Sequence, residues 1–529
     1  MDGFRPPVGP GARYAPGVTL GLALLLAPGA ARAADLPAVG PDDRFRVDIP
    51  DFAGAEATSE LGSVLLAPPP AGTKWRVEEA PVLDDYDATE AIEALGAEPW
   101  HAAGLTGEGV KVAVFDVQWF DTLLWEDELG AYTTHDCQSH RSCDVPMDTL
   151  RPRYAFEEGS HGVACAQSIR DIAPGVELYL VRVNGQTTLE NAAAWAVREG
   201  IDVVSMSMSF FNNSFHDGTG GVNAAVDVLA AGGVLLVNSA GNYATEHWVG
   251  DFHDPDGDGD LDFPWGSAYL PVYYGAGTQS VQVAWDQFAS CGDTDLDVYI
   301  YDRAGNVVGR SEDRQEKDAD NCSPVERVRL EAATADWYWI RLVRRAGDAS
   351  ARVSLFARGG DLLYPEPGSV ADPASHPSAF TVGAVRADGY LGNDAESFSS
   401  RGPTHAGLPK PDIAGPDGFT TAIYGVRGFY GTSAATPAVA AAIALLLSED
   451  PRLTPREAAD RLQANAISGR ATWEAADGAL GAGYARLPAP GAAEVRGCDA
   501  TGGTRSPAGA AAALAPSLLW LSLIRRRRA

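Results

Sequence analysis

Two different patterns of hydrophobic and polar residues divide the chain. Between about residues 95 and 250, short continuous apolar runs alternate with segments that repeat apolar residues at helical spacing. The apolar runs have the character of strands that are covered on both faces of a sheet. They are VAVFD, VELYLVRV, IDVVSMSMS and VLLVNSAGN. Strands and helices in alternation predict an α/β fold, with a parallel sheet flanked by helices.

The pattern changes near Asp251. From about residue 251 to 360, short alternating runs such as VQVAW, LDVYIYD and WYWIRLV are separated by Gly, Asp and Asn turns. Alternation at a period of two with frequent turns predicts an all-β sandwich. The α/β pattern resumes at FTVGAV, so residues 361–487 are predicted to complete the α/β domain around the inserted sandwich.

Helix starts can also be located from capping residues. Thr187 with Glu190 predicts a capping box at the start of one helix, and Thr454 with Glu457 predicts another, with Pro455 in the first helical position.

The two ends of the chain differ from the middle. Residues 1–33 combine arginines, a short apolar run and an Ala-rich cleavage site, which predicts a secretory signal peptide. Residues 34–94 are acidic and Pro-interrupted and predict a pro-segment or N-terminal arm. Residues 488–509 form a linker, and residues 510–529 are an apolar segment with an Arg cluster. This tail predicts attachment to the membrane and a location in the cell envelope or at the surface.

The order of motifs in this tail also resembles that of a known class of C-terminal segments. Gly497 and Cys498, the apolar segment and the terminal Arg cluster resemble myxobacterial-type C-terminal sorting tails. The resemblance implies processing and surface anchoring at Cys498. A plain short membrane anchor is the alternative, and it also places the protein in the envelope.

The net charge and the cysteines indicate which partners the protein can bind and in which compartment it is found. The net charge of −31 excludes nucleic acid as a partner, because a phosphate backbone would be repelled. The chain has six cysteines, as is typical of exported proteins. Their spacing predicts two local disulfides, Cys137 with Cys143 and Cys291 with Cys322, and leaves Cys165 as a small buried hydrophobe.

Four polar residues lie near strand ends or helix starts, where α/β sheets hold their reacting groups. Asp116 ends the first apolar run, Asn242 follows a later one, and His161 and Ser433 each stand at the start of an apolar helical segment. A serine hydroxyl needs an imidazole to accept its proton, and a carboxylate to orient that imidazole. An amide beyond a strand end can donate to a developing oxyanion. Together the four residues predict acyl transfer.

The motifs around these residues resemble those of the subtilisin-like serine peptidases. VAVFD, HGVACA, NSAGN and GTSAATP occur in that family's order, and SFSSRGPT and KPDIAGPDG are similar to its accessory segments. The resemblance implies a serine endopeptidase that acts on proteins or peptides as a monomer, without a required cofactor. It implies Ser433 as nucleophile, His161 as base, Asp116 as orienting carboxylate and Asn242 as oxyanion donor.

The resemblance also implies a substrate-binding segment, with three departures. Ser207, Met208 and Ser209 stand where the family pairs with the substrate backbone, and Ser209 replaces a Gly. Asp116 is followed by Val117 and Gln118 instead of the usual Thr-Gly or Ser-Gly, and HGTH is replaced by HGVA. These changes leave open a rival function, a catalytically impaired binding protein on the same scaffold.

The insert begins with alternating carboxylates. Asp254, Asp256, Asp258 and Asp260, with Gly259 between the last two, resemble the front of a calcium loop. The closing Glu is missing, because Trp265 holds the twelfth position. A calcium site and a solvated acidic turn therefore both stay open. The insert itself resembles the pre-peptidase-type domains that accompany secreted bacterial proteases.

Overall fold

A computed structural model provides the structure of the protein. It describes residues 88–120, 122–137, 143–149, 159–211, 213–290, 292–315, 324–347, 350–468 and 478–491. The predicted signal peptide, most of the pro-segment and nearly all of the C-terminal linker and tail lie outside these residues. The predicted Cys291–Cys322 pair also lies outside them.

A parallel seven-stranded sheet forms the centre of the α/β region. Its strand order is β16-β15-β5-β4-β1-β3-β2, and every neighbouring pair is parallel. The strands are β1 Lys111–Asp116, β2 Tyr132–Asp136, β3 Glu177–Arg182, β4 Val203–Met206, β5 Leu235–Ser239, β15 Phe380–Arg386 and β16 Ile413–Asp417. The predicted α/β fold with a parallel sheet is confirmed.

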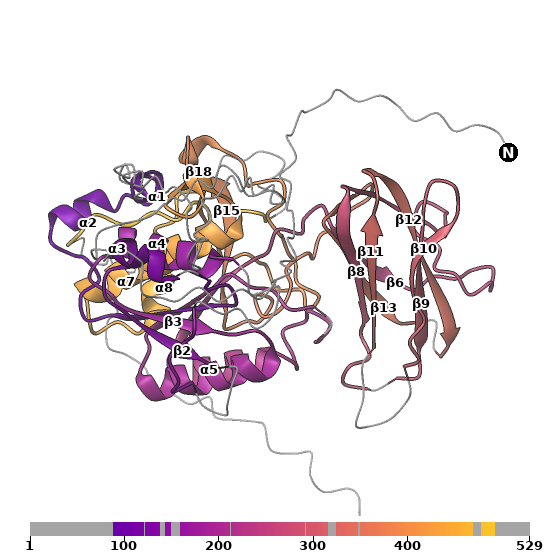
Figure 1. Ribbon diagram of the computed structural model, residues 1–529, viewed down its shortest axis with the longest axis horizontal. Helices are drawn as coiled ribbons and strands as arrows, with labels where there is room; N and C mark the ends of the chain where they lie inside the picture. Colours follow the sequence, from indigo (N-terminus) through magenta and orange to yellow (C-terminus); the bar gives the residue numbers. More distant parts are fainter. Residues whose placement is uncertain are drawn as a thin grey trace, which may run out of the picture. The chain divides into compact units, whose positions relative to one another are not determined.

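Helices cover both faces of this sheet. Successive residues of β1 point to opposite sides, so Val112 and Val114 join one apolar cluster while Ala113 and Phe115 join another. In Figure 1, α5 lies on one side of β2 and β3, and α4, α7 and α8 lie on the other. Among the described residues, the helices are α1 Thr89–Leu95, α2 Glu98–Ala102, α3 Glu126–Leu129, α4 His161–Ile172, α5 Gln186–Glu199, α6 Asn223–Ala231, α7 Thr432–Glu449 and α8 Pro455–Ala464, with short 3₁₀ turns η1 Thr122–Trp125 and η3 Tyr390–Gly392.

The two predicted helix caps had different outcomes. At α8 the capping box is present, because Thr454 and Glu457 each accept from the backbone N–H of the other. At α5 the prediction was wrong. The helix begins at Gln186, and Thr188 Oγ1 accepts from the N–H of Gly185 at 3.0 Å. Gly185 is therefore the N-cap residue and Thr187 lies in the first turn, so the predicted helix start was two residues too late.

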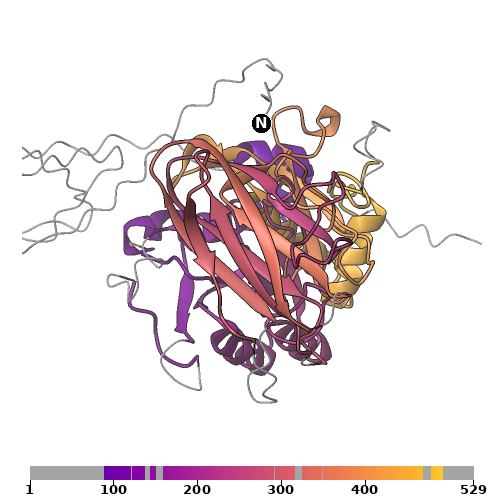
Figure 2. The ribbon, with the colours of Figure 1, turned by 90° about the vertical axis from the view of Figure 1, so that its right-hand side faces the viewer.

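The chain between β5 and β15 forms two antiparallel sheets that share one apolar core. Their orders are β10-β9-β12-β7-β14 and β11-β8-β13-β6. The strands are β6 His247–Asp251, β7 Leu270–Tyr274, β8 Gly277–Trp285, β9 Asp295–Tyr301, β10 Val307–Ser311, β11 Val325–Ala332, β12 Asp336–Ala346, β13 Arg352–Arg358 and β14 Gly360–Leu362. Figure 2 shows these strands side by side. The inserted β-structure therefore begins slightly before residue 251.

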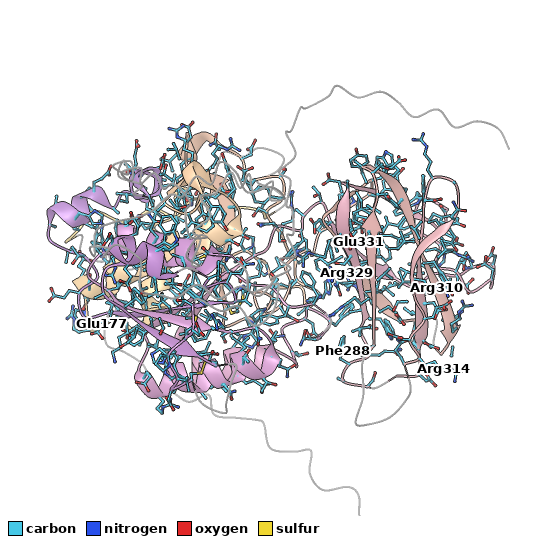
Figure 3. All side chains as sticks on the ribbon, in the orientation of Figure 1. Glu177, Phe288, Arg310, Arg314, Arg329 and Glu331 are labelled. Atoms are coloured by element: carbon cyan, nitrogen blue, oxygen red, sulfur yellow. A yellow bond between two sulfur atoms is a disulfide. The ribbon has the colours of Figure 1, made fainter. Side chains whose placement is uncertain are left out.

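Alternation along the strands explains the sandwich core. On β11, Val328 and Leu330 are buried while Arg329 and Glu331 are exposed (Figure 3). The buried positions of both sheets meet in a single apolar cluster that includes Val283, Val298 and Leu342. A period of two thus separates core from surface in this region, as the sequence predicted.

Three further segments position the α/β domain. A hairpin of β17 Phe419–Thr421 and β18 Gly425–Phe429 leads directly into α7. The helix α1 packs into the same apolar cluster as α4 and α7, so the structured domain includes residues from 88 onward. The predicted Cys137–Cys143 disulfide is present.

Among the described residues, α7 is the one helix long and apolar enough to cross a membrane. It is mostly buried within the protein, and packing in the α/β core explains its composition.

Candidate active site

Asp116 ends β1, and its carboxylate is completely buried. Oδ1 accepts hydrogen bonds from the N–H groups of Val117 and Gln118, at 2.8 and 2.9 Å. Oδ2 accepts from Nδ1 of His161 at 2.7 Å. Three donors therefore compensate the burial of this carboxylate. The unusual residues after Asp116 hold it through their backbone, so the substitution of these side chains leaves its anchoring intact.

His161 is the first residue of α4, and its ring is partly exposed. Since Nδ1 donates to Asp116, Nε2 is the nitrogen that can accept a proton. Burial disfavours the charged imidazolium, but the charge of Asp116 and its hydrogen bond outweigh burial and raise the pKa of His161. Gly162 permits this approach, because a Cβ there would lie 2.8 Å from the Cβ of Asp116.

Ser433 is the second residue of α7 and is half-buried. Pro437 lies four residues later and has no N–H, so the carbonyl oxygen of Ser433 lacks its helical partner. Two side chains contact this oxygen instead: Ser207 Oγ donates to it at 3.0 Å and Cys165 Sγ at 3.7 Å. Cys165 is one helical turn after His161, so the contact brings the start of α7 against the turn of α4 that carries the predicted base.

Asn242 follows β5 and is bonded to the residue before Ser433. Its Oδ1 accepts from the N–H of Thr432 at 3.0 Å and from the Thr432 hydroxyl at 2.9 Å. With the oxygen fixed in this way, Nδ2 is left as the donor. A Cβ on Gly431 would lie 2.9 Å from Nδ2, which places that donor beside the turn that leads to Ser433. The role of this amide as an oxyanion donor remains a prediction.

The predicted substrate-binding segment follows β4. Ser207, Met208 and Ser209 are all half-buried. The Ser207 side chain is used internally, on the Ser433 carbonyl. The Met208 side chain packs against the apolar cluster under α5, and its carbonyl accepts from Asn238 Nδ2 at 3.3 Å. These contacts fix the segment beside the start of α7, and substrate pairing remains a prediction.

The acidic turn of the insert brings three of its four predicted ligands together. Carboxylate oxygens of Asp254, Asp256 and Asp258 lie within 4.8 Å of one another. Asp260 does not join them, because its two oxygens accept from Arg341 at 2.7 Å each. Asp254 also accepts from Arg344 at 3.0 Å. The predicted set of four was therefore too large, and three carboxylates, one already paired, are the residues that could hold calcium.

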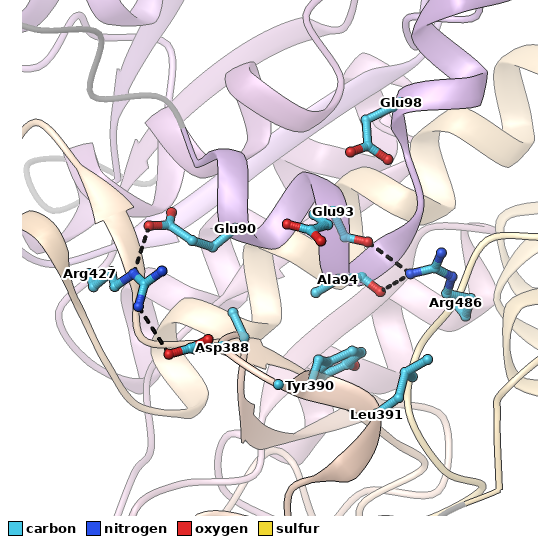
Figure 4. A pocket seen from close by; sticks show the side chains of 11 residues that line it. Glu90, Glu93, Ala94, Glu98, Asp388, Tyr390, Leu391, Arg427 and Arg486 are labelled. Atoms are coloured by element: carbon cyan, nitrogen blue, oxygen red, sulfur yellow. Dashed lines mark hydrogen bonds and ion pairs between the residues drawn. The ribbon is translucent and has the colours of Figure 1, made fainter.

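A surface pocket of about 450 Å³ lies beside α1, and none of the four predicted catalytic residues lines it. Its arginines are engaged in packing (Figure 4): Arg427 pairs with Glu90 at 3.4 Å and Asp388 at 3.0 Å, and Arg486 donates to the carbonyl of Glu93 at 2.8 Å. The Arg427–Glu90 pair ties α1 to the hairpin of β17 and β18. The charged groups of the pocket that these contacts involve are thus already paired within the protein.

The sequence motifs did not reveal the contacts that support the predicted site residues. Thr432 orients Asn242, and Cys165 touches the Ser433 carbonyl. One signal was available, since Pro437 four residues after Ser433 implies that another group must satisfy that carbonyl.

Comparisons with known proteins identify the family of the chain. Residues 107–281 and 290–484 match the Subtilase family. The chain is 26% identical over 459 residues to the minor extracellular protease Vpr of Bacillus subtilis (strain 168), covering 77% of this chain and 54% of that protein. It is 35% identical over 182 residues to subtilisin E of the same organism, covering 31% of this chain and 43% of that protein. The chain thus spans about half, or less, of the length of these relatives.

A solved structure shows the same fold. The CspB protease of Clostridium perfringens superposes with a TM-score of 0.52 at 16% identity, covering 75% of this chain and 96% of that one. The family match extends over most of the chain and includes both halves of the parallel sheet, together with the strand ends and helix starts described above. This protein therefore belongs to the subtilase family.

Proposed function

We propose that the protein is an exported serine endopeptidase that hydrolyses peptide bonds of proteins. The observation that supports this most is the bond of His161 Nδ1 to the buried Asp116, which leaves Nε2 as a base. Ser433 lies at the start of a helix whose first turn contacts the α4 turn of that imidazole. Asn242 is fixed to the residue before Ser433.

In the proposed reaction, Ser433 Oγ attacks the carbonyl carbon of the scissile peptide. His161 Nε2 takes the hydroxyl proton and then delivers it to the leaving amine, so that an acyl-enzyme forms. The same nitrogen then activates a water that hydrolyses the ester. Asn242 Nδ2 donates to the oxyanion in both halves, and loss of such a donor costs about 3 kcal/mol of transition-state stabilisation.

The anchoring of Asp116 favours catalysis over the rival function of an impaired binding protein. The rival rests on the altered loop after Asp116, yet Val117 and Gln118 donate their N–H groups to the carboxylate. With Oδ1 held by these two N–H groups, Oδ2 stays directed at Nδ1 of His161, which is the arrangement that the proposed catalysis needs.

Labelling by a fluorophosphonate probe tests the proposal, because only an activated serine reacts. We expect the wild-type chain to be labelled and Ser433→Ala not to be labelled. Ser448→Ala is the matched control, since it removes another hydroxyl of α7, one that bonds to the Leu445 carbonyl near the far end of the helix. Equal labelling of wild type and Ser433→Ala, or no labelling of either, would support the binding protein instead.

Location and ligands complete the proposal. An N-terminal signal and a C-terminal sorting tail would place the enzyme at the cell surface or in the envelope, and the extracellular location in the name of the Vpr relative supports export. The substrates would be proteins or peptides, and the enzyme would act as a monomer. The insert, proposed to be a pre-peptidase-type domain, would bind calcium through Asp254, Asp256 and Asp258.

A further inference from the structure

A second buried carboxylate lies close to the nucleophile turn. Asp417 ends β16 and is completely buried. Its Oδ2 accepts from the N–H of Gly431 at 2.8 Å, while Oδ1 has no hydrogen-bond partner among the residues described. Burying a carboxylate with a single donor is costly. Such a group needs an explanation other than stability.

The partner of Asp417 joins the predicted nucleophile to the predicted oxyanion donor. Gly431 has φ of 102° and precedes Thr432, which holds Asn242 and is followed by Ser433. The carbonyl of Gly431 accepts from Ala434 at 2.9 Å and so begins α7. The carbonyl of Gly431 is thus fixed by α7, and its N–H is fixed by Asp417.

The same bond closes the hairpin that leads into α7. Gly418 donates to the carbonyl of Phe429 at 2.8 Å, directly beside the Asp417–Gly431 contact. Further along the hairpin, Glu90 accepts from the N–H and hydroxyl of Thr420, at 3.1 and 3.0 Å. Gln167 of α4 also accepts from the N–H of Ala422 at 2.9 Å. Among these contacts, the Asp417 contact is the one that reaches the residues that flank Ser433.

We propose that Asp417 is a positioning residue for the hydrolytic reaction, acting through Gly431 on both Ser433 and Asn242. This inference rests on the proposed function. An ionised carboxylate holds an N–H more strongly than a neutral acceptor does, so the turn is most firmly fixed when Asp417 is charged.

The groups around Asp417 set the pH at which it gains that charge. Burial raises the pKa of Asp417 to about 7; the Gly431 hydrogen bond lowers it, Glu396 raises it and Arg386 lowers it. Arg386 is the register partner of Asp417 on β15, and its Nε bonds to Glu396 at 3.2 Å. Among the residues that the structure describes, Tyr390 and Tyr430 also face this site.

The test compares fluorophosphonate labelling rates of wild type, Asp417→Ala and Asp417→Asn. Removal of the acceptor in Asp417→Ala should slow labelling about tenfold, as for loss of a hydrogen bond to a charged group, and should lower kcat with little change in KM. Asn keeps an acceptor oxygen but cannot ionise. The rate of Asp417→Asn should therefore match wild type near pH 6 and fall behind it as the pH rises through about 7.

The labelling rate of Asp417→Asn is divided by that of wild type at each pH. The effect of His161 titration cancels in this ratio, because both proteins contain His161. Asp202→Asn is the matched control: Asp202 precedes β4 at the opposite end of the sheet, and its Oδ2 accepts from the Lys111 N–H at 2.8 Å. Its rate relative to wild type should not vary with pH.

The outcomes separate this inference from the function on which it rests. Failure of the wild type to label would overturn the proposed function and this inference with it. Labelling of the wild type with an unaffected Asp417→Ala would overturn the inference alone. If Asp417→Ala does not fold, the Asp417→Asn ratio decides, and a ratio that is flat across about pH 6 to 9 overturns the inference.

Discussion

The α/β region and the β-sandwich place their charged groups differently. In the α/β region, completely buried carboxylates such as Asp116 and Asp417 bond to residues of other elements at the carboxyl ends of the strands. In the sandwich, Asp260 and Asp297 pair with arginines whose side chains are partly exposed. Both regions bury large apolar clusters.

This difference indicates what each set of charges does. Burying a carboxylate costs folding free energy, but a buried carboxylate can hold an imidazole or a backbone N–H in the position that a reaction needs. An arginine–carboxylate pair at the rim of a sandwich satisfies its own charges and leaves no group free for chemistry. Changes of charge at Asp116 and Asp417 should therefore alter activity, and changes in the sandwich should alter stability alone.

The largest expected effect is the loss of activity in Asp116→Asn. Asn can still accept the two backbone N–H groups, but it cannot fix His161 in the productive tautomer. We expect kcat to fall about 10⁴-fold, with a melting temperature close to that of wild type. Measurements of kcat and of thermal melting by circular dichroism test this.

Asp297→Asn is the matched change in the sandwich. Asp297 is a nearly buried carboxylate that pairs with Arg345, and its replacement should leave kcat within about twofold of wild type. A large loss of kcat in Asp297→Asn, or full activity in Asp116→Asn, would contradict the division between the two regions.

A core substitution in the sandwich should have the opposite effect. Leu342 on β12 is completely buried, and Leu342→Ala should cost about 2–5 kcal/mol of folding free energy. Hydrogen exchange followed by mass spectrometry should show loss of protection in the sandwich strands. The rate of Ser433 labelling should stay unchanged.

Val439→Ala on α7 is the control for Leu342→Ala, because Val439 is equally buried but lies on the helix of Ser433. It should affect both protection and labelling. A sandwich variant that labels as slowly as Val439→Ala would show that the insert takes part in the reaction.

The sequence was most informative about candidate site residues that their immediate neighbours in the chain point to. Asp116 ends an apolar run, and His161 and Ser433 stand beside small residues at helix starts, so each could be found from its neighbours in the chain. The Asp417–Gly431 bond and the Ser207–Ser433 bond join segments distant in sequence. No local pattern encodes which strand end meets which turn, so these contacts required the fold.

The errors have the same origin. Alternation suggested Asp260 as a ligand, but Arg341, from a distant strand, takes both of its oxygens. The sequence predicts Thr187 as a cap, but it is the neighbouring Thr188 whose Oγ1 accepts from the N–H of Gly185 at the start of the helix. Periodicity identifies which residues share a face, and competition between partners in space decides what each of them binds.

A smaller effect is expected from pH, through a cluster of histidines that contains residues of both regions. The ring of His405 lies 5.5 Å from that of His247 on β6 and 5.9 Å from that of His216. His405 Nδ1 donates to the carbonyl of Phe215 at 2.5 Å. Burial, together with the neighbouring His216, lowers the pKa of His405 to about 3, and burial also lowers the pKa of His247.

The sign follows from where the proton binds. Below about pH 6.5 an unfolded chain protonates the imidazoles of His405 and His247 while the folded chain does not, so stability falls as the pH decreases. Each group contributes a slope of up to about 1.4 kcal/mol per pH unit. His405→Gln should reduce the slope by that amount in urea unfolding at about pH 4 to 7. An unchanged slope would mean that His405 is not buried as a neutral ring.

The smallest effect concerns calcium at the acidic turn of the insert. Asp254, Asp256 and Asp258 offer three carboxylates, but Arg344 already neutralises the first. A weak extracellular type of site, at millimolar calcium, would stabilise the fold by about 1 kcal/mol. Calcium should raise the melting temperature of wild type and leave that of the double variant Asp256→Asn, Asp258→Asn unchanged, with magnesium as the control. Equal shifts in both proteins would leave these carboxylates as a solvated turn. A calcium shift that also changed Ser433 labelling would mean that charge in the sandwich reaches the reaction after all.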